Sequence, residues 1–250
     1  MKRTPLILTV VAGILVFLGV LVLYLPASWF ASMLPAQVRC NELGGSLWQG
    51  ECLGFTYQDS PLGDATWNLS AFKAATGRLV GDVDLRGTLV NARADLDLSF
   101  AGVGELRNLN ARFPLDPSLS PQFSRDQRGN VVAELARLEL TERGLPGLIQ
   151  GKLELHDYRM LSPQPMPLGS YLLTFDGAAQ PDGGSVGKIK DLGGPFIVDA
   201  TFTLTPPNAY SVVGFITGRT ADAERIVRQI TFGVQPDASG RSEFRFEGTL

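Results

Sequence analysis

The sequence predicts an all-β domain made of an antiparallel sheet, with one short helix inside the domain and one transmembrane helix before it. Two observations predict the sheet. Apolar and polar residues alternate along many short segments, and turn-forming residues, among 28 glycines and 16 prolines, separate those segments. A period of two is typical of strands with one buried and one wet face, which favours antiparallel pairing. The third observation, an uncharged run from Leu6 to Leu25, predicts the transmembrane helix.

The run from Leu6 to Leu25 is long enough to cross a membrane. At ~1.5 Å per residue, a helix of this length spans the ~30 Å hydrocarbon core of a bilayer. A cleaved signal peptide has a shorter apolar region that ends in small residues, whereas bulky Trp29 and Phe30 follow this run. We therefore expect an uncleaved anchor.

Basic residues set the expected orientation of the anchor. Lys2 and Arg3 precede the run, and the next basic residue is Arg39. The positive-inside rule then places residues 1–5 in the cytoplasm and the chain after the helix on the exported side.

Residues 26–37 are expected to form a membrane-proximal connector. Trp29, Phe30, Met33 and Leu34 fall at helical spacing, so one face is able to rest on the membrane surface. A plain linker turn is the alternative.

Residues 38–250 form the predicted β-domain. Alternation marks strands within residues 82–86, 92–100, 136–141, 152–156, 171–175, 198–205, 210–216 and 244–246. One helix is expected after Thr220, a suitable cap, with Asp222 near its positive end and Arg228 in its last turns. Residues 79–85 and 149–155 resemble each other weakly, which leaves open a division into two sub-parts joined near residues 114–121.

Cys40 and Cys52 lie on the exported side, where disulfides form and persist. Gly44-Gly45 is a turn signal between them, so strands over residues 38–43 and 46–50 are expected to form a hairpin that brings the sulfur atoms together. A structural disulfide is the preferred interpretation, because a metal site would lack further ligands and a redox pair would have Cys-x-x-Cys spacing.

The sequence contains none of the common catalytic motifs. Its single histidine, His156, lies on the polar side of a strand between Glu154 and Tyr158, where a solvated side chain is expected. No Gly-x-Ser-x-Gly elbow, His-Glu-x-x-His motif, P-loop or dinucleotide fingerprint occurs. We therefore expect no enzymatic activity, and no catalytic, cofactor-binding or metal-binding residues.

Paired acids occur at Asp82/Asp84 and at Asp95/Asp97. Residues two apart share one face of a strand, so each pair is able to bind a cation or to act as acid and base. A solvated, charge-balanced outer face explains the same spacing and is preferred.

The charge balance argues against nucleic-acid binding. Of the 22 Lys and Arg residues two precede the apolar run, and the chain holds 25 Asp and Glu. The exported part is therefore acidic, and its basic residues do not cluster into the stripe that nucleic acid needs.

The segment from Gly45 to Gly50 resembles a motif of type II secretion system protein N, an inner-membrane component of the secretion machinery of Gram-negative bacteria. The residues that carry the motif are Gly45, Leu47, Trp48 and Gly50. Similar segments follow in the family's order at residues 64–69, 168–175 and 191–198, and the chain closes on Gly248-Thr249-Leu250.

This resemblance implies a non-enzymatic accessory subunit of the type II secretion apparatus. The protein would be a single-pass protein of the cell inner membrane, with its main domain in the periplasm and no cofactor. The implied partners are the outer-membrane secretin and the inner-membrane platform proteins. The Cys40 and Cys52 pair is not a feature that the family requires.

The family is also similar to the AsmA-like proteins, whose strongly bent sheet forms an apolar groove. This similarity implies a curved or folded-over sheet, taco-like or resembling an open sandwich. It also supplies the alternative function, lipid binding or lipid transfer. Inner residues that would line such a groove include Leu96, Leu98, Phe100, Phe202 and Leu204.

Overall fold

The computed structural model describes residues 13–14, 17, 19–119, 123–141, 146–162, 164–178, 183–206, 208–231 and 234–249. Its helices are η1 (Ala27–Met33), a 3₁₀ helix, α2 (Ala71–Ala74) and α3 (Ala221–Ile230). Its strands are β1 (Val38–Arg39), β2 (Glu42–Gly45), β3 (Gln49–Tyr57), β4 (Ser60–Leu69), β5 (Arg78–Arg86), β6 (Asn91–Ser99), β7 (Gly104–Pro114), β8 (Gln127–Leu140), β9 (Pro146–Met160), β10 (Met166–Asp176), β11 (Ser185–Gly193), β12 (Phe196–Thr205), β13 (Ala209–Gly218) and β14 (Ser242–Thr249).

Half of the predicted transmembrane helix, Leu6 to Leu25, falls on residues that the structure does not describe. Residues 1–12, 15, 16 and 18 lie outside the described residues, while residues 13, 14, 17 and 19–23 are helical. Within the described parts of the chain, no helix is both long enough and apolar enough to cross a bilayer.

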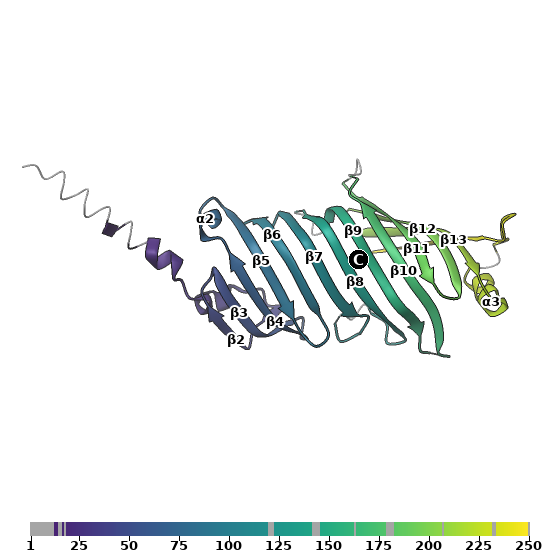
Figure 1. The fold of residues 1–250 in the computed structure, drawn as a ribbon, viewed down its shortest axis with the longest axis horizontal. Coiled ribbons are helices and arrows are strands. Elements are labelled where there is room, and N and C mark those ends of the chain that lie inside the picture. The colour runs from purple at the N-terminus through teal and green to yellow at the C-terminus, as the bar shows by residue number, and fades with distance from the viewer. Residues whose placement is uncertain are drawn as a thin grey trace, which may run out of the picture.

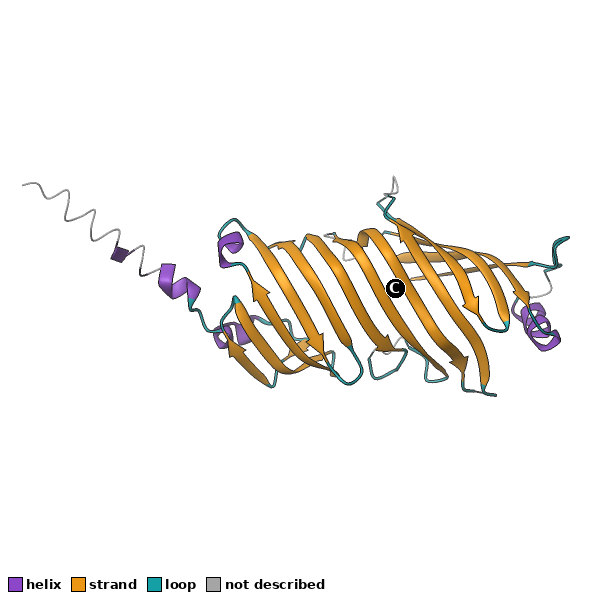
Figure 2. Ribbon diagram, viewed as in Figure 1, coloured by secondary structure: helices purple, strands orange, loops and turns teal. Residues whose placement is uncertain are grey.

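The strands form one open antiparallel sheet of 14 strands (Figures 1 and 2). From β3 to β14 each strand pairs with the next one along the chain, and β1 and β2 both pair with β3. Strands β7 and β8 pair from Gly104 opposite Leu140 to Pro114 opposite Asn130, so the sheet continues across the proline-rich segment between them. The sheet therefore extends from the membrane-proximal connector to the C-terminal strand.

The strand register places apolar residues on one face of the sheet and charged residues on the other. Across β5 and β6, Leu79 lies opposite Leu98 and Val83 opposite Ala94, whereas Asp84 lies opposite Arg93. Because side chains alternate between faces, this pairing produces one apolar face and one charged face. We call these the inner face and the outer face.

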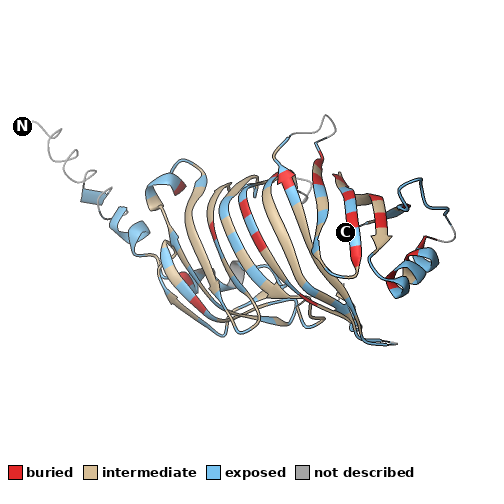
Figure 3. Cartoon of the chain, turned by 45° about the vertical axis from the view of Figure 1, so that its right-hand side comes forward, coloured by how far each residue is buried: buried red, intermediate tan, exposed pale blue. Residues whose placement is uncertain are grey.

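The inner face is buried most extensively in the C-terminal half of the sheet. There the strands curl round, and Leu204 of β12 packs in one cluster with Leu135 of β8, Ile149 of β9 and Phe175 of β10. A second cluster joins β12 and β13 to α3, whose Ala223 and Val227 pack on the sheet. Figure 3 shows buried residues gathered in this half, while the N-terminal strands are mostly half-buried or exposed.

Breaks in register accompany the bending of the long strands. The pairing of β6 with β7 shifts between Arg93 and Asp95, next to Asn108 of β7. Further shifts occur where β9 pairs with β8 and with β10. Asn108 and Asp157 have φ angles of 51° and 52°, in the left-handed region. Such bulges insert an extra residue, bend the strand and increase its twist.

The strands expected from alternation coincide with observed strands, except that those expected over residues 92–100 and 136–141 each run one residue past the end of β6 and β8. The expected helix is present as α3. Thr220 caps α3: its hydroxyl accepts a hydrogen bond from the amide of Ala223, 3.2 Å away. Sequence patterning did not reveal α2, which has only four residues.

The turn expected at Gly44-Gly45 was wrong. Both glycines belong to β2, and the chain turns at residues 46–48 instead, with Gly45 opposite Gly50. Hydrogen bonds at Ser46 explain the shift, because its amide donates to the carbonyl of Gln49 and its hydroxyl accepts from the Gln49 amide. A Gly-Gly signal marks conformational freedom but does not decide where pairing ends.

Candidate functional site

The candidate site is a hollow on the inner face of the N-terminal half of the sheet. Its volume is about 440 Å³, within the ~300–1,000 Å³ range of ligand pockets. Every residue that lines it is apolar or belongs to the disulfide: Ala27, Leu34, Val38, Cys40, Leu43, Leu47, Cys52, Phe55, Ala65, Trp67, Leu69, Leu79, Val83, Leu85, Leu96 and Leu98. The hollow therefore offers shape and apolar contact but no charged group.

The hollow exists because the N-terminal strands have no second layer over them among the described residues. Leu96 and Leu98 point into it and stay half-buried. In the C-terminal half, by contrast, Leu204 is 3% exposed, and the ring of Phe202 packs edge to face on that of Phe175. Of the five residues expected to line a groove, only Leu96 and Leu98 do so.

Phe100 was expected among the inner residues and is not one of them. It follows β6 in the turn before β7 and is 66% exposed. A turn residue lies beyond the last paired position, so the alternation of the strand no longer fixes its side.

The connector closes one end of the hollow. Ala27 of η1 is 2% exposed and Leu34 lies at the rim. Trp29, which was expected to face the membrane surface, is 67% exposed, whereas the side chains of Phe30 and Met33 lie outside the described residues. The apolar lining is thus continuous with the segment next to the predicted anchor.

Cys40 and Cys52 form a disulfide at the same end, with 5.5 Å between their Cα atoms. Cys40 lies in the break between β1 and β2, and Cys52 is 3% exposed within β3. The bond ties the edge of the sheet to its neighbouring strand, and it also forms part of the wall of the hollow.

The Gly-x-Leu-Trp-x-Gly segment joins the helical residues 19–23 to the sheet. The indole nitrogen of Trp48 donates a hydrogen bond to the carbonyl of Val22 at 2.8 Å, and the amide of Leu47 donates to the carbonyl of Leu25 at 2.9 Å. Carbonyls at a helix C-terminus lack the usual partner four residues along. The carbonyl of Val22 also accepts from the amide of Leu25 at 3.4 Å, and Leu25 itself lies beyond the helical residues. Trp67 of β4 belongs to the same connection, since its indole nitrogen donates to the carbonyl of Leu47 at 3.0 Å. We call this set of hydrogen bonds around Leu47, Trp48 and Trp67 the Trp48 joint.

The two motif glycines leave room for this joint. A Cβ on Gly50 would lie 2.5 Å from Cζ2 of Trp67 and 2.7 Å from the carbonyl oxygen of Gly44. Gly45 has a φ of 77°, in the left-handed region, and a Cβ there would lie 2.5 Å from the carbonyl oxygen of Gln49. Both positions therefore need glycine for steric reasons.

The paired acids lie on the outer face, each beside a polar partner. Asp97 pairs with Arg78 at 2.7 Å and Asp84 with Arg86 at 2.7 Å. Asp82 and Asp95 accept hydrogen bonds from the side-chain amides of Asn68 and Asn108. Among the described residues, no group of three or more His, Cys, Asp or Glu is placed to hold a metal ion.

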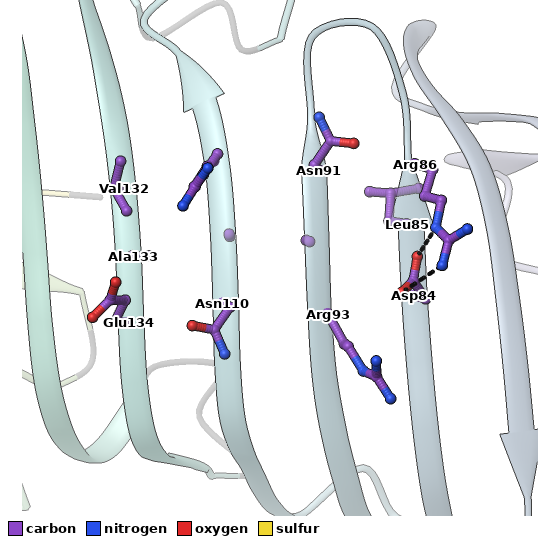
Figure 4. A pocket seen from close by; sticks show the side chains of 12 residues that line it. Asp84, Leu85, Arg86, Asn91, Arg93, Asn110, Val132, Ala133 and Glu134 are labelled. Atoms are coloured by element: carbon purple, nitrogen blue, oxygen red, sulfur yellow. Dashed lines mark hydrogen bonds and ion pairs between the residues drawn. The ribbon is translucent and has the colours of Figure 1, made fainter.

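A shallow polar groove of about 350 Å³ crosses this outer face between β5 and β8 (Figure 4). Arg93 and Arg112 line it, and within the described chain neither forms an ion pair, whereas Arg86 is held by Asp84. Free guanidinium groups beside amides favour contact with acidic protein surface. The groove was not expected from the sequence, because it depends on residues from four strands.

His156 is a surface residue that contacts carboxylate rather than a nucleophile. Its Nε2 lies 2.9 Å from Oε2 of Glu154, and the Nζ of Lys152 lies 2.9 Å from the other oxygen. The hydrogen bond from Lys152, with a smaller one from His156, lowers the pKa of Glu154 below its usual value. Lys152, Glu154 and His156 alternate along β9, so their polar side chains lie in a row on one face of that strand.

Sequence reasoning placed only Leu96 and Leu98 in the hollow, and Ala27 and Trp67 illustrate why the other lining residues were missed. The alternation Ala65, Trp67, Leu69 in β4 could have placed Trp67 on the inner face. No local signal could have placed Ala27 there, because its burial depends on how the connector packs against the sheet.

Comparison with known proteins gives one match. A family model described as type II secretion system (T2SS), protein N, matches residues 36–245. No curated protein and no solved structure matches the chain. The similarity to AsmA-like proteins receives no support from these comparisons, and the family match covers all strands up to the middle of β14.

Proposed function

This chain belongs to the type II secretion system protein N family, which indicates a role in type II secretion, and from that premise we propose that it is an accessory subunit that links the inner-membrane platform to the secretin. The link is made by protein contacts and involves no enzymatic step. The observation that carries this proposal is the extent of the family match, which covers the sheet from its first strand to its last.

The proposed location follows from the apolar N-terminal run. Residues 6–25 anchor the protein in the cell inner membrane, residues 1–5 are cytoplasmic and the β-domain is periplasmic. Two observations support this arrangement: basic residues flank the run on one side only, and the Trp48 joint ties its end to the sheet. A sheet held in this way presents its outer face, with Arg93 and Arg112, to neighbouring subunits.

Deletion and complementation test the proposed role. Removing the gene should abolish the appearance of exported enzymes in the medium, and the wild-type gene should restore it. Detergent-solubilised full-length protein should also retain the secretin or a platform protein in pull-downs. Unchanged secretion together with no association of these subunits would refute the proposal.

Photo-crosslinking can then identify the face that makes the contact. A photoreactive residue at Arg112, exposed on the outer face, should crosslink to a platform protein or to the secretin. The same residue at Leu98, in the hollow, is the matched control and should give no such product. Products from Leu98 and none from Arg112 would contradict the outer-face contact.

The hollow supports a second candidate function, the binding of a lipid acyl chain. Its lining carries no charge, and its rim at Ala27 and Leu34 adjoins the membrane-proximal connector. In this proposal the sheet acts as the folded-over, taco-like trough that the sequence resemblance implies. An acyl chain would cover half-buried leucines that no other described layer covers.

Native mass spectrometry with a matched pair of variants tests lipid binding. Val83 of β5 lines the hollow, whereas Val80 on the same strand belongs to the outer face, and both are half-buried. Val83→Gln should remove co-purifying lipid, and Val80→Gln should retain it. Absence of lipid from the wild-type protein, or equal loss in both variants, would overturn the second candidate.

A further inference from the structure

The C-terminal strand β14 forms an edge of the sheet with one unpaired side. It pairs with β13 over its whole length, from Ile216 opposite Ser242 to Ala209 opposite Thr249, without a shift in register. Within the described chain, no strand pairs with its other side. Such an edge presents a row of free amide and carbonyl groups that can pair with another strand.

The opposite edge of the sheet is protected by short, interrupted strands, whereas β14 is long and continuous. At the N-terminal edge, β1 has two residues and β2 has four, and a break at Cys40 and Asn41 separates them. Short, interrupted strands are a common protection against edge pairing. Strand β14 has eight residues and contains no proline.

The side chains of β14 are complementary to a second, antiparallel copy of the same strand. Glu243, Arg245 and Glu247 alternate with Phe244 and Phe246, so charges lie on one face and rings on the other. Phe246 is 54% exposed although it belongs to the inner, apolar face. Glu243 and Glu247 lie two residues before and after Arg245 on the same face. An antiparallel copy of the strand can therefore place its glutamate opposite this arginine.

We propose that β14 pairs with β14 of a second copy of this chain, on a two-fold axis at Phe246. This register sets each Arg245 opposite Glu247 of the second copy and packs the two Phe246 rings together. Centring the pair on Arg245 would instead set arginine opposite arginine and acid opposite acid, which is unfavourable. The contact goes beyond the proposed function, because a link between secretion subunits does not require two copies.

A contact of this type is isologous, so it closes after two copies and leaves no further edge at this end of the sheet. Cα atoms of directly opposed residues on antiparallel strands lie about 4.5–5.5 Å apart, within the ~4.4–6.8 Å range of disulfides. A cysteine introduced at position 246 would therefore be able to form a disulfide with the same cysteine of the second copy. The native cysteines do not interfere, because Cys40 and Cys52 are bonded to each other.

Phe246→Cys in the detergent-solubilised full-length protein tests the two-fold axis. Mild oxidation should convert most of this variant to a covalent dimer on a non-reducing gel. Phe100→Cys is the matched control, since Phe100 is also an exposed phenylalanine but lies in the turn after β6. A dimer yield no higher than that of Phe100→Cys would overturn the proposal.

Charge exchange tests the register on the same Phe246→Cys background. Arg245→Glu should lose the covalent dimer, because like charges then face each other across the axis. Adding Glu247→Arg should restore it by exchanging the two charges, provided that the melting temperatures confirm folding of each variant. Retention of the dimer in Arg245→Glu alone, or crosslinking of position 246 to a different protein in cells, would refute pairing with a second copy.

Discussion

Replacing Gly50 by alanine tests whether the Trp48 joint, between the N-terminal segment and the sheet, leaves no room for a Cβ atom at this position. The new Cβ would lie 2.5 Å from Cζ2 of Trp67, 2.7 Å from the carbonyl oxygen of Gly44 and 2.8 Å from that of Ser46. The two carbonyls belong to β2 and to the turn that follows it, so they are part of the backbone of the hairpin and cannot rotate away as a side chain would. The ring of Trp67 can shift only by weakening its hydrogen bond to the carbonyl of Leu47.

The expected cost follows from these contacts. Overpacking of this kind destabilises a protein by about 1–3 kcal/mol, and the loss of one hydrogen bond costs about 0.5–1.5 kcal/mol net. Because the ring shift is one way of relieving the clash, the two costs do not add fully, and we expect about 1–3 kcal/mol in total. For a domain of this size, 1 kcal/mol lowers Tm by about 2–4 °C.

Thermal unfolding of the full-length protein in detergent, followed by circular dichroism, measures this loss. Gly44→Ala is the matched control, because Gly44 lies in the same hairpin and a Cβ there meets only the flexible side chain of Glu51, at 3.1 Å. Gly44→Ala should change stability by no more than about 0.5 kcal/mol. If Gly50→Ala lowers Tm no more than Gly44→Ala does, the steric reasoning about the joint is wrong.

Four further predictions concern the rest of the domain. Leu204→Ala should cost about 2–5 kcal/mol in denaturant unfolding, because Leu204 is 3% exposed in the cluster that holds the curled half together; a loss below 1 kcal/mol would contradict this. Thr220→Ala should cost about 0.5–2 kcal/mol by removing the cap of α3, whereas Thr220→Asn should restore most of it. Burial raises the pKa of Tyr171 to about 12, above the value of about 10 in an unfolded chain. The folded state is therefore favoured below pH ~10 and loses this contribution as the pH rises towards ~12, so Tyr171→Phe should flatten the decline of stability in that window, and an equally steep decline would refute it. Finally, the protein isolated without reductant should show no free thiols, and quantitative alkylation of Cys40 and Cys52 would disprove the disulfide.

Much of the fold could be predicted because its signals are local. Ala92, Ala94, Leu96 and Leu98 alternate with polar residues, and they share the inner face of β6 as expected. Thr220 caps α3 through a hydrogen bond three residues along the chain. The charge-balanced outer face was also predictable, since Asp84 finds its partner Arg86 on the same strand.

The candidate site was less predictable because it depends on contacts between distant residues. The motif was recognisable in the sequence, but its role as a joint rests on Trp48 reaching Val22, 26 residues earlier. Phe100 illustrates the limit of alternation, because the strand ends at Ser99 and its periodicity ends there as well. The turn at residues 46–48 was missed since hydrogen bonds of Ser46, rather than the two glycines, decide where β2 stops.

The sequence alone determined the strands, their two-faced character and the capped helix, because alternation, turn residues and capping act over a few residues. Only the tertiary structure decided which apolar side chains are covered. The inner residues of β5, β6 and β12 follow the same alternating pattern, yet Leu204 is buried while Leu96 and Leu98 border an open hollow. The difference arises because the C-terminal half of the sheet curls onto itself and receives α3, whereas in the described chain only the connector covers part of the N-terminal half.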